Sequence, residues 1–189
     1  MMFNTRKNFD ATPNMFIDKV QLELVESYKL LGVQIRSDLS WMDNTVYICK
    51  KGFMRLWILR RLKLLGAAKD EIMEVYVKQV RPVLELAVPV WHHGLTQNES
   101  TQIERVQKCA LHIVLGSSYS TYENALIACN IQSLAERKMK ICEKFAKKSI
   151  KSSKFQHWYV ANNVNVKPWT ETSIYQNSPL PEINNSSTH

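Results

Sequence analysis

The sequence predicts a mainly α-helical protein, with a short N-terminal β-hairpin or strands followed by a multi-helix bundle and a disordered C-terminal tail. Three observations predict this fold class. Apolar residues alternate between positions 14 and 35, as in short strands. From position 41 to 151 they recur at helical spacing, and several helix starts carry capping residues. Beyond position 152 this periodicity is lost, and Asn, Ser, Thr and Pro predominate.

The chain length limits the number of domains. With 189 residues the chain has room for one packed core and a loose end, but two full domains would be cramped. We therefore expect a β segment over residues 1–40, a helical region over 41–151 and a disordered tail over 152–189.

The first segment is expected to form strands with a turn between them. Val20, Leu22 and Leu24 alternate with polar residues, and further apolar residues follow up to position 35. The polar pair Asp18 and Lys19 favours a turn before this alternation.

A long helix is expected over residues 44–65. This stretch has no proline, is rich in Leu, Arg and Lys, and stops at Gly66, a residue type that is common directly after a helix. Phe53 and Trp57 lie between its cations and are interpreted as core residues.

A second helix is expected over residues 70–80. Pro82 either kinks this helix or starts a new segment that reaches Trp91, because proline cannot continue a helical hydrogen-bond ladder. Pro89 is expected to interrupt that new segment.

Three later helix starts have the pattern of a capping box. In this pattern a Ser or Thr oxygen accepts from a backbone N–H, and a Glu three residues later reaches back. The pairs are Thr96 with Glu99, Ser120 with Glu123, and Ser133 with Glu136.

Two of the later helices are predicted to be amphipathic, with a basic side and an apolar side. In the first, the core side comprises Ile103, Val106, Ala110 and Ile113, and the outer side comprises Arg105, Lys108 and His112. In the last, over residues 134–150, the apolar stripe comprises Ala135, Met139, Cys142 and Ala146. Its basic stripe comprises Arg137, Lys140, Lys144, Lys148 and Lys151.

Several kinds of catalytic or metal site are not expected. Glycine-rich phosphate motifs are missing, and no two aspartates are adjacent or four apart on a helix, so no catalytic residue and no metal ligand is predicted. His92 and His93 are interpreted as exposed or capping side chains. The cysteines have neither zinc-site nor disulfide spacing and are interpreted as buried thiols: Cys49, Cys109, Cys129 and Cys142.

The sequence also predicts where the protein works. No stretch approaches the roughly 20 apolar residues of a membrane span. The start of the chain lacks the apolar core of a secretory signal. We expect a protein of the nucleus or cytoplasm that is not secreted and has no membrane partner.

The charge of the chain favours polyanionic partners. The formal net charge is +8 and the isoelectric point is about 9.3. Clustered cations neutralise phosphates and bind nucleic acid in a salt-dependent way, although a solvated helix face is the alternative interpretation. The cations cluster in the long helix: Lys50, Lys51, Arg55, Arg60, Arg61 and Lys63.

Short motifs along the chain support a more specific hypothesis. They include Lys-Leu-Leu-Gly-Val-Gln-Ile at 29–35, Asp-Leu-Ser-Trp at 38–41, Val-Arg-Pro-Val-Leu-Glu at 80–85 and Glu-Arg-Val-Gln-Lys at 104–108. Others lie at 2–4, 44–45, 76, 89–92, 95–96, 115–116, 119, 122, 125–126, 134, 136–138, 142 and 145–148. Their order resembles the end of the palm, the thumb and the post-thumb region of a non-LTR (LINE- or jockey-like) retrotransposon reverse transcriptase. The resemblance covers residues 2–150, with mild departures at Leu86 and Lys138.

The resemblance implies a catalytically incomplete fragment of an RNA-directed DNA polymerase. The family's fingers and palm, with the Tyr-x-Asp-Asp turn that holds Mg²⁺, would precede Met1, so no enzymatic activity and no cofactor are expected. Leu31 and Gly32 match the segment that supports the primer end. The helices after Trp41 match a thumb that grips the template–primer duplex. Weak, nonspecific binding of an RNA or DNA duplex is therefore expected.

The predicted nucleic-acid-binding residues are Leu31, Gly32, Lys50, Lys51, Arg55, Arg60, Arg61, Lys63, Arg105, Lys108, Arg137, Lys140 and Lys144. An alternative hypothesis is a co-opted helical protein–protein interaction module without nucleic-acid function. Exposed apolar surface would favour that module, or self-association of the chain. Salt-dependent binding of a duplex would separate the two hypotheses.

Overall fold

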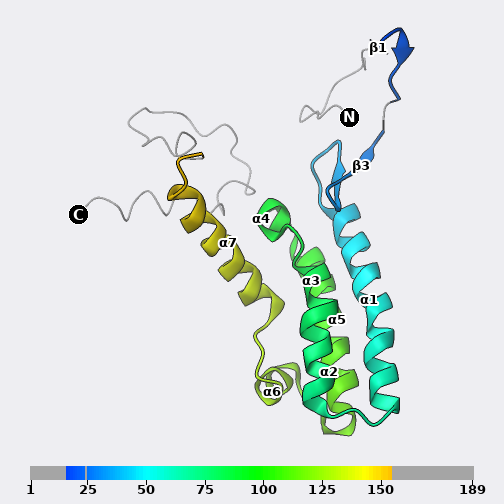
Figure 1. The fold of residues 1–189 in the computed structure, drawn as a ribbon, viewed down its shortest axis with the longest axis vertical. Helices are drawn as coiled ribbons and strands as arrows, with labels where there is room; N and C mark the ends of the chain where they lie inside the picture. Colours follow the sequence, from blue (N-terminus) through cyan, green and yellow to red (C-terminus); the bar gives the residue numbers. More distant parts are fainter. Residues whose placement is uncertain (1–15, 24, 155–189) are drawn as a thin grey trace, which may run out of the picture.

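The computed structural model describes residues 16–23 and 25–154 of the chain. The motif at residues 2–4 lies outside this range, as does the predicted disordered tail except for 152–154. The predicted fold class is confirmed, because short antiparallel strand pairs precede a group of helices (Figure 1). Among the described helices, none combines the length and the apolar character needed to cross a bilayer.

A first hairpin begins the described chain. β1 (Phe16–Ile17) pairs antiparallel with β2 (Val20–Gln21). Asp18 and Lys19 form the turn, with positive φ angles of 49° and 66°. Two adjacent positive φ angles suit the tight turns whose twist matches that of antiparallel strands. The predicted turn at this polar pair is confirmed, and the residues of both strands are exposed.

A second hairpin leads into the helices. β3 (Ser27–Leu30) pairs antiparallel with β4 (Val33–Arg36). Leu31 and Gly32 form its turn, with φ angles of 49° and 90°. Val33 is buried, so this hairpin, unlike the first, contributes a side chain to the core.

The helix α1 (Met42–Leu64) is attached to the second hairpin near its first turn. Asn44 Oδ1 accepts a hydrogen bond at 3.2 Å from the backbone N–H of Gln34. The helix ends as predicted before Gly66, whose φ of 81° is a left-handed conformation that favours glycine.

The middle of the chain is a helical stretch broken near its prolines. Pro82 has no N–H and removes a donor from the helical ladder, and the turn before it is wider than an α-helix. As predicted, a new helical segment starts near Pro82. A further break, at residues 85–87, precedes Pro89, which lies in the first turn of the helix that follows. The pieces are α2 (Lys69–Val75), the π-helical turn η1 (Tyr76–Val80), α3 (Arg81–Leu84) and α4 (Val88–Trp91).

Capping side chains begin the later helices. Thr96 Oγ1 accepts from the backbone N–H of Glu99 at 3.3 Å, and the Glu99 carboxylate accepts from the Thr96 N–H at 2.7 Å, so this capping box is confirmed. Ser133 Oγ accepts from Glu136 N at 3.2 Å. The elements are η2 (His92–Gly94), α5 (Gln97–Leu115), η3 (Gly116–Ser118), α6 (Tyr122–Ala128) and α7 (Leu134–Ile150).

The prediction that Ser120 caps its helix is wrong. The helix begins one residue later, and Thr121 Oγ1 accepts from the backbone N–H of Asn124 at 3.2 Å. The Ser120 hydroxyl accepts instead from the Asn124 side-chain amide at 3.2 Å. Two adjacent hydroxyl residues offered two possible caps, and the extended backbone at Thr121 decided between them.

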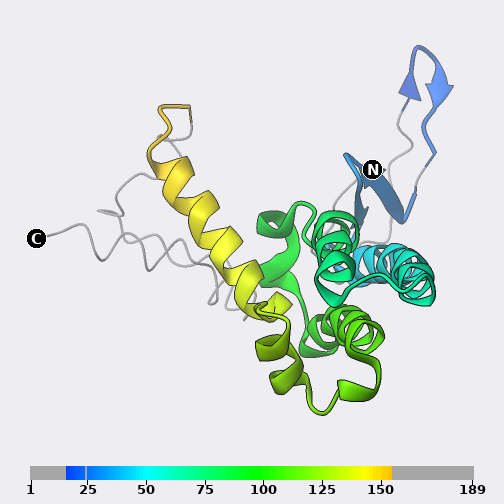
Figure 2. The same cartoon turned by 60° about the horizontal axis from the view of Figure 1, so that its bottom comes forward.

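The helices pack around one core. α1 lies along α5 and α3, and α7 lies on the other side of these helices against α4 and α5 (Figures 1 and 2). A Cβ atom at Gly52 would lie 2.9 Å from side-chain atoms of both Leu84 and Val106, so a glycine here lets α1 approach α3 and α5 closely. Large side chains that are fully buried in this core include Trp91, Tyr76, Leu56, Leu59, Leu84, Ile103, Leu111 and Leu134.

The predicted apolar stripe of α7 is partly wrong. Met139 is 49% exposed and Ala135 is exposed, whereas Lys138 is fully buried. Leu134 sets the buried row, because residues four apart lie on the same side of a helix. The buried residues of α7 are Leu134, Lys138, Cys142, Ala146 and Ser149.

The interpretation of Phe53 and Trp57 as core residues is also wrong. Trp57 is 61% exposed and Phe53 is 38% exposed. The side of α1 that faces the core carries Ile48, Leu56 and Leu59 instead. An apolar residue in a cation-rich helix is therefore not always buried in this protein.

The cysteines follow their predicted interpretation in part. Cys49 and Cys142 are buried, and burial raises the pKa of each thiol to about 11. Cys109, in α5, and Cys129, directly after α6, are only half-buried. All four thiols are free.

Candidate nucleic-acid interface

The tip of the second hairpin lies against a groove between α1 and α3. A Cβ atom at Gly32 would lie 3.1 Å from the Cδ2 atom of Leu86, so the turn is in close contact with this side chain. Leu86 in turn lines a groove of about 220 Å³ together with Lys51 and Arg55. The fold thereby brings Gly32 near the predicted cations Lys51 and Arg55 of α1, whereas the side chain of Leu31 is 92% exposed. Tyr47, Ile48, Pro82 and Val83 complete the lining.

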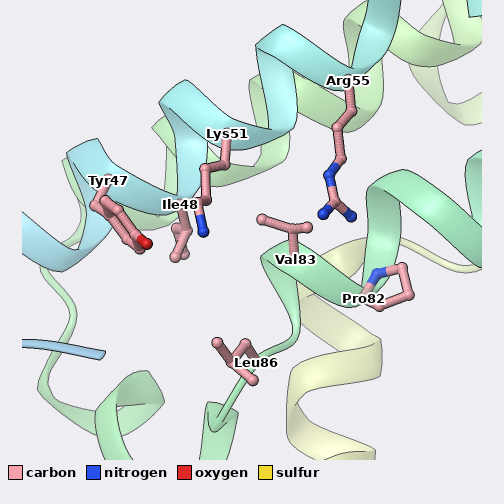
Figure 3. A pocket seen from close by; sticks show the side chains of 7 residues that line it. All are labelled: Tyr47, Ile48, Lys51, Arg55, Pro82, Val83 and Leu86. Carbon is pink, nitrogen blue, oxygen red and sulfur yellow. The ribbon is translucent and has the colours of Figure 1, made fainter. Parts of the chain in front are cut away.

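One side of α1 supplies the polar groups of this groove. Tyr47, Lys51 and Arg55 are spaced four residues apart, which places them on the same side of the helix. Figure 3 shows Lys51 and Arg55 projecting from α1 toward Val83 and Pro82 of the opposite helix. The lining contains cationic and apolar side chains and no carboxylate, so a phosphate would meet no negative charge there.

Lys29, which was not among the predicted binding residues, lies beside the groove residue Tyr47. Its Nζ lies 4.9 Å from the centre of the Tyr47 ring, and Lys51 Nζ lies 4.7 Å from the same ring. The ammonium groups of Lys29 and then Lys51 lower the pKa of the Tyr47 hydroxyl. Lys29 directly precedes the Leu-Leu-Gly turn, and this position in the sequence could have indicated that it lies near the turn.

Arg55 is partly engaged inside the protein. Its guanidinium Nη1 donates to the backbone carbonyl of Gln79, in the π-helical turn before Pro82. This contact holds the Arg55 side chain across the groove and leaves its other guanidinium N–H groups available.

The other predicted cations of α1 do not line the groove. Lys50, Arg60 and Arg61 are exposed on the outer side of the helix. Lys63 Nζ instead donates to the carbonyls of Ile113 and of Val114, the latter at 3.3 Å. This places a positive charge at the C-terminal end of α5, where free carbonyls and the helix dipole favour it.

The predicted cations of α5 and α7 lie apart from the groove. Arg105 is exposed, and Lys108 Nζ lies 4.9 Å from the centre of the Tyr122 ring. Lys140 and Lys144 are exposed on α7, which lies across α3 and α5 from α1 (Figure 2). The predicted residues therefore do not form one continuous patch.

Arg137 is a structural residue in this fold. It is half-buried, and its Nη2 donates to Glu85 Oε2 at 3.0 Å. Glu85 also pairs with Arg81 at 3.7 Å. The Glu85 carboxylate raises the pKa of Arg137. The ion pair ties α7 to the end of α3, which leaves less of this guanidinium for a phosphate.

The motif at 104–108 divides between the outside and the inside of the protein. Gln107 is fully buried and accepts from Tyr76 Oη at 2.6 Å, while its Nε2 donates to Tyr122 Oη at 2.9 Å. Tyr122 donates to Glu104, whose carboxylate also accepts from the Leu134 N–H at 2.9 Å. This buried network links η1, α5, α6 and α7, whereas the cations of the motif point outward.

The histidine pair differs from its predicted interpretation. His92 and His93 are half-buried, and their ring centres lie 5.1 Å apart. Burial lowers the pKa of His92 to about 4, with a further contribution from Lys138. Among the residues that the structure describes, no group of three or more His, Cys, Asp or Glu side chains could hold a metal ion.

Comparisons with other proteins give no family assignment. No protein-family model matches the chain, and neither a curated protein nor a solved structure matches it.

Proposed function

We propose that this chain binds nucleic-acid duplexes nonspecifically, as the template–primer-gripping end of a retrotransposon reverse transcriptase would. One observation supports the proposal: Gly32 in the hairpin turn lies next to Leu86, which lines the groove together with Lys51 and Arg55. The resemblance gives the turn a role at the primer end and gives α1 a role on the duplex. Those roles require the two segments to be neighbours.

The chemistry of the groove suits a sugar–phosphate backbone. Lys51 and Arg55 offer N–H donors to phosphate oxygens, and Tyr47, Val83 and Leu86 offer apolar surface to sugars. Such contacts read backbone shape and charge, so little sequence preference is expected. We expect this activity in the nucleus or cytoplasm.

The proposal includes no polymerase activity for this chain. No catalytic step is therefore assigned to any residue. Primer extension with Mg²⁺ or Mn²⁺ tests this part, and robust DNA synthesis would overturn it.

Binding of a fluorescent RNA–DNA duplex across a salt series tests the grip. The groove variant is Lys51→Glu with Arg55→Glu. The matched control is Lys147→Glu with Lys151→Glu, which makes the same change in net charge at two exposed positions. Each lost phosphate contact should reduce the slope of log affinity against log salt by about 0.9. We expect the groove variant to lose at least about tenfold in affinity, and the control to lose much less.

Equal losses in the groove variant and the control would show that only net charge matters, and this would contradict a grip at the groove. Binding that does not change with salt would contradict phosphate contacts altogether. Circular dichroism spectra of both variants establish that the helices remain folded.

A further inference from the structure

The outer side of α1 carries an exposed stripe of residues at coiled-coil spacing. The stripe residues alternate between spacings of four and three, as the facing positions of paired helices do. Its apolar members are exposed, at 55% for Val46, 61% for Trp57 and 79% for Leu64. We call this set the outer stripe, and its members are Val46, Lys50, Phe53, Trp57, Arg60 and Leu64.

No described element covers the outer stripe. The main partners of α1 among the described elements are α5, α3, η1, α2 and β4. The buried side of α1 carries Ile48, Gly52, Leu56 and Leu59. Met54, next to the outer stripe, is 68% exposed. Several large apolar side chains exposed on one side of a helix favour an interaction site.

The charges of the outer stripe identify the chemistry of its partner. Lys50 and Arg60 belong to the stripe, and Arg61 lies beside it. The only carboxylate in α1 is Asp43, which pairs with Arg36 at the start of the helix. A helix that fills the stripe therefore needs apolar residues opposite Phe53 and Trp57 and acidic residues opposite the cations.

A second copy of the same stripe does not meet this requirement. In an antiparallel pair with Phe53 opposite Trp57, Lys50 would face Arg60. In a parallel pair, each cation would face its own copy. Like charges at facing positions oppose association, so both arrangements of a self-pair are disfavoured.

We propose that the outer stripe docks an acidic amphipathic helix from a partner protein. A nucleic-acid strand would satisfy the cations and could stack on Trp57, but it offers no apolar side chains for Val46 and Leu64. The inference does not depend on the proposed function, because no residue of the outer stripe lines the groove.

A designed peptide tests the docking surface on the full chain. The probe is a fluorescein-labelled helical 21-mer with leucines at its facing positions and glutamates opposite Lys50 and Arg60. Fluorescence anisotropy should show saturable binding. Trp57→Ser should weaken it at least about tenfold, since an aromatic anchor at the centre of an interface contributes about 2 kcal/mol or more.

A charge exchange makes the test specific. The variant Lys50→Glu with Arg60→Glu should no longer bind the glutamate peptide. It should instead bind a peptide of the same sequence in which lysines replace the glutamates. The matched control, Lys140→Glu with Lys144→Glu on α7, should bind the glutamate peptide like the unchanged protein. Circular dichroism establishes that each variant is folded.

Other outcomes overturn the proposal. Failure of the charge exchange, or an equal loss in the α7 control, would show that the outer stripe does not select its partner. If no peptide binds and Trp57→Ser abolishes binding of single-stranded RNA, the occupant is nucleic acid. If the protein sediments as a dimer and Trp57→Ser makes it a monomer, the occupant is a second copy.

Discussion

Lys138 is the residue whose environment is least compatible with its charge. Its side chain is fully buried, and its Nζ has no hydrogen-bond partner among the described residues. The closest aromatic interaction is with Trp91, whose ring centre lies 6.0 Å from Nζ. A buried charge without a hydrogen-bonded partner costs several kcal/mol in the interior of a protein, even after relaxation.

Replacing this lysine with methionine is expected to stabilise the fold. Lys138→Met keeps most of the side-chain volume and removes the unpaired ammonium, so the free energy of unfolding should rise by about 1–3 kcal/mol. Urea denaturation measures it. Lys144→Met, at an exposed position of the same helix, serves as the control and should change little. A destabilised Lys138→Met protein would indicate a partner for the ammonium.

The pH dependence of stability provides a second check on Lys138. Burial is the main cause that lowers the pKa of Lys138. The unfolded chain then binds the proton more tightly than the folded one. Stability should therefore rise with pH between the lowered folded pKa and the ordinary lysine value of about 10.4. This rise should be smaller in Lys138→Met.

His92 should make the protein sensitive to acid. Its pKa in the folded protein is about 4, against an ordinary value of 6.5, with burial as the first cause and Lys138 as the second. The unfolded chain binds more protons in this window, so stability should fall as pH drops from 6.5 to 4. Melting temperatures across this range should be flatter for His92→Gln. A His92 pKa that stays unchanged in Lys138→Met, measured by NMR, would contradict the electrostatic contribution.

At the scale of elements, Gly52 limits the approach of α1 to its neighbours. An added Cβ would lie 2.9 Å from both Leu84 Cδ2 and Val106 Cγ1, closer than such contacts allow. Alanine would gain about 1 kcal/mol in helix propensity, but overpacking costs about 1–3 kcal/mol. We expect Gly52→Ala to lose about 1 kcal/mol net, measured by chemical denaturation. Stabilisation would mean that α1 and α5 separate without cost.

The buried network should be stabilising as a unit. Gln107→Leu would leave the Tyr76 hydroxyl without its acceptor in a fully buried position and should cost about 2 kcal/mol. Adding Tyr76→Phe removes the orphaned hydroxyl, so the double variant should lose less than the sum of the single losses. Urea denaturation of all four proteins in this cycle measures the coupling. Additive losses would show that the hydrogen bond contributes nothing.

Helix ends that depend on the backbone chemistry of one or two residues could be predicted from the sequence. The buried side of a helix, which depends on packing against other elements, could not. Gly66, Pro82 and the Thr96 cap act through their own backbone chemistry, and each ended, broke or began a helix as expected. The buried row of α7 was misjudged because sequence periodicity favoured Met139 over Lys138. The observed orientation of α7 follows from Leu134, whose side chain is buried in the core formed with the other helices.

At the scale of the whole molecule, the net charge of +8 overstates the cationic surface available to a polyanion. Lys63 binds the carbonyls at the end of α5, Lys69 donates to Ala128 at the end of α6, and Arg137 pairs with Glu85. The hairpin turn and the groove cations Lys51 and Arg55 were among the residues predicted from the sequence. The sequence did not distinguish these cations from those with a structural role. The partners of Lys63, Lys69 and Arg137 lie about fifty residues or more away along the chain, where no local pattern reveals them.

The network from Tyr76 to Glu104 also bears on how the molecule opens. It joins the π-helical turn to the first backbone N–H groups of α7, so α7 cannot detach without breaking bonds that start in the centre of the core. Local opening is then costly, and the described helices should unfold as one cooperative unit. Hydrogen exchange should show the α7 amides past the first turn exchanging as slowly as those of α5. Gln107→Leu should release α7 first.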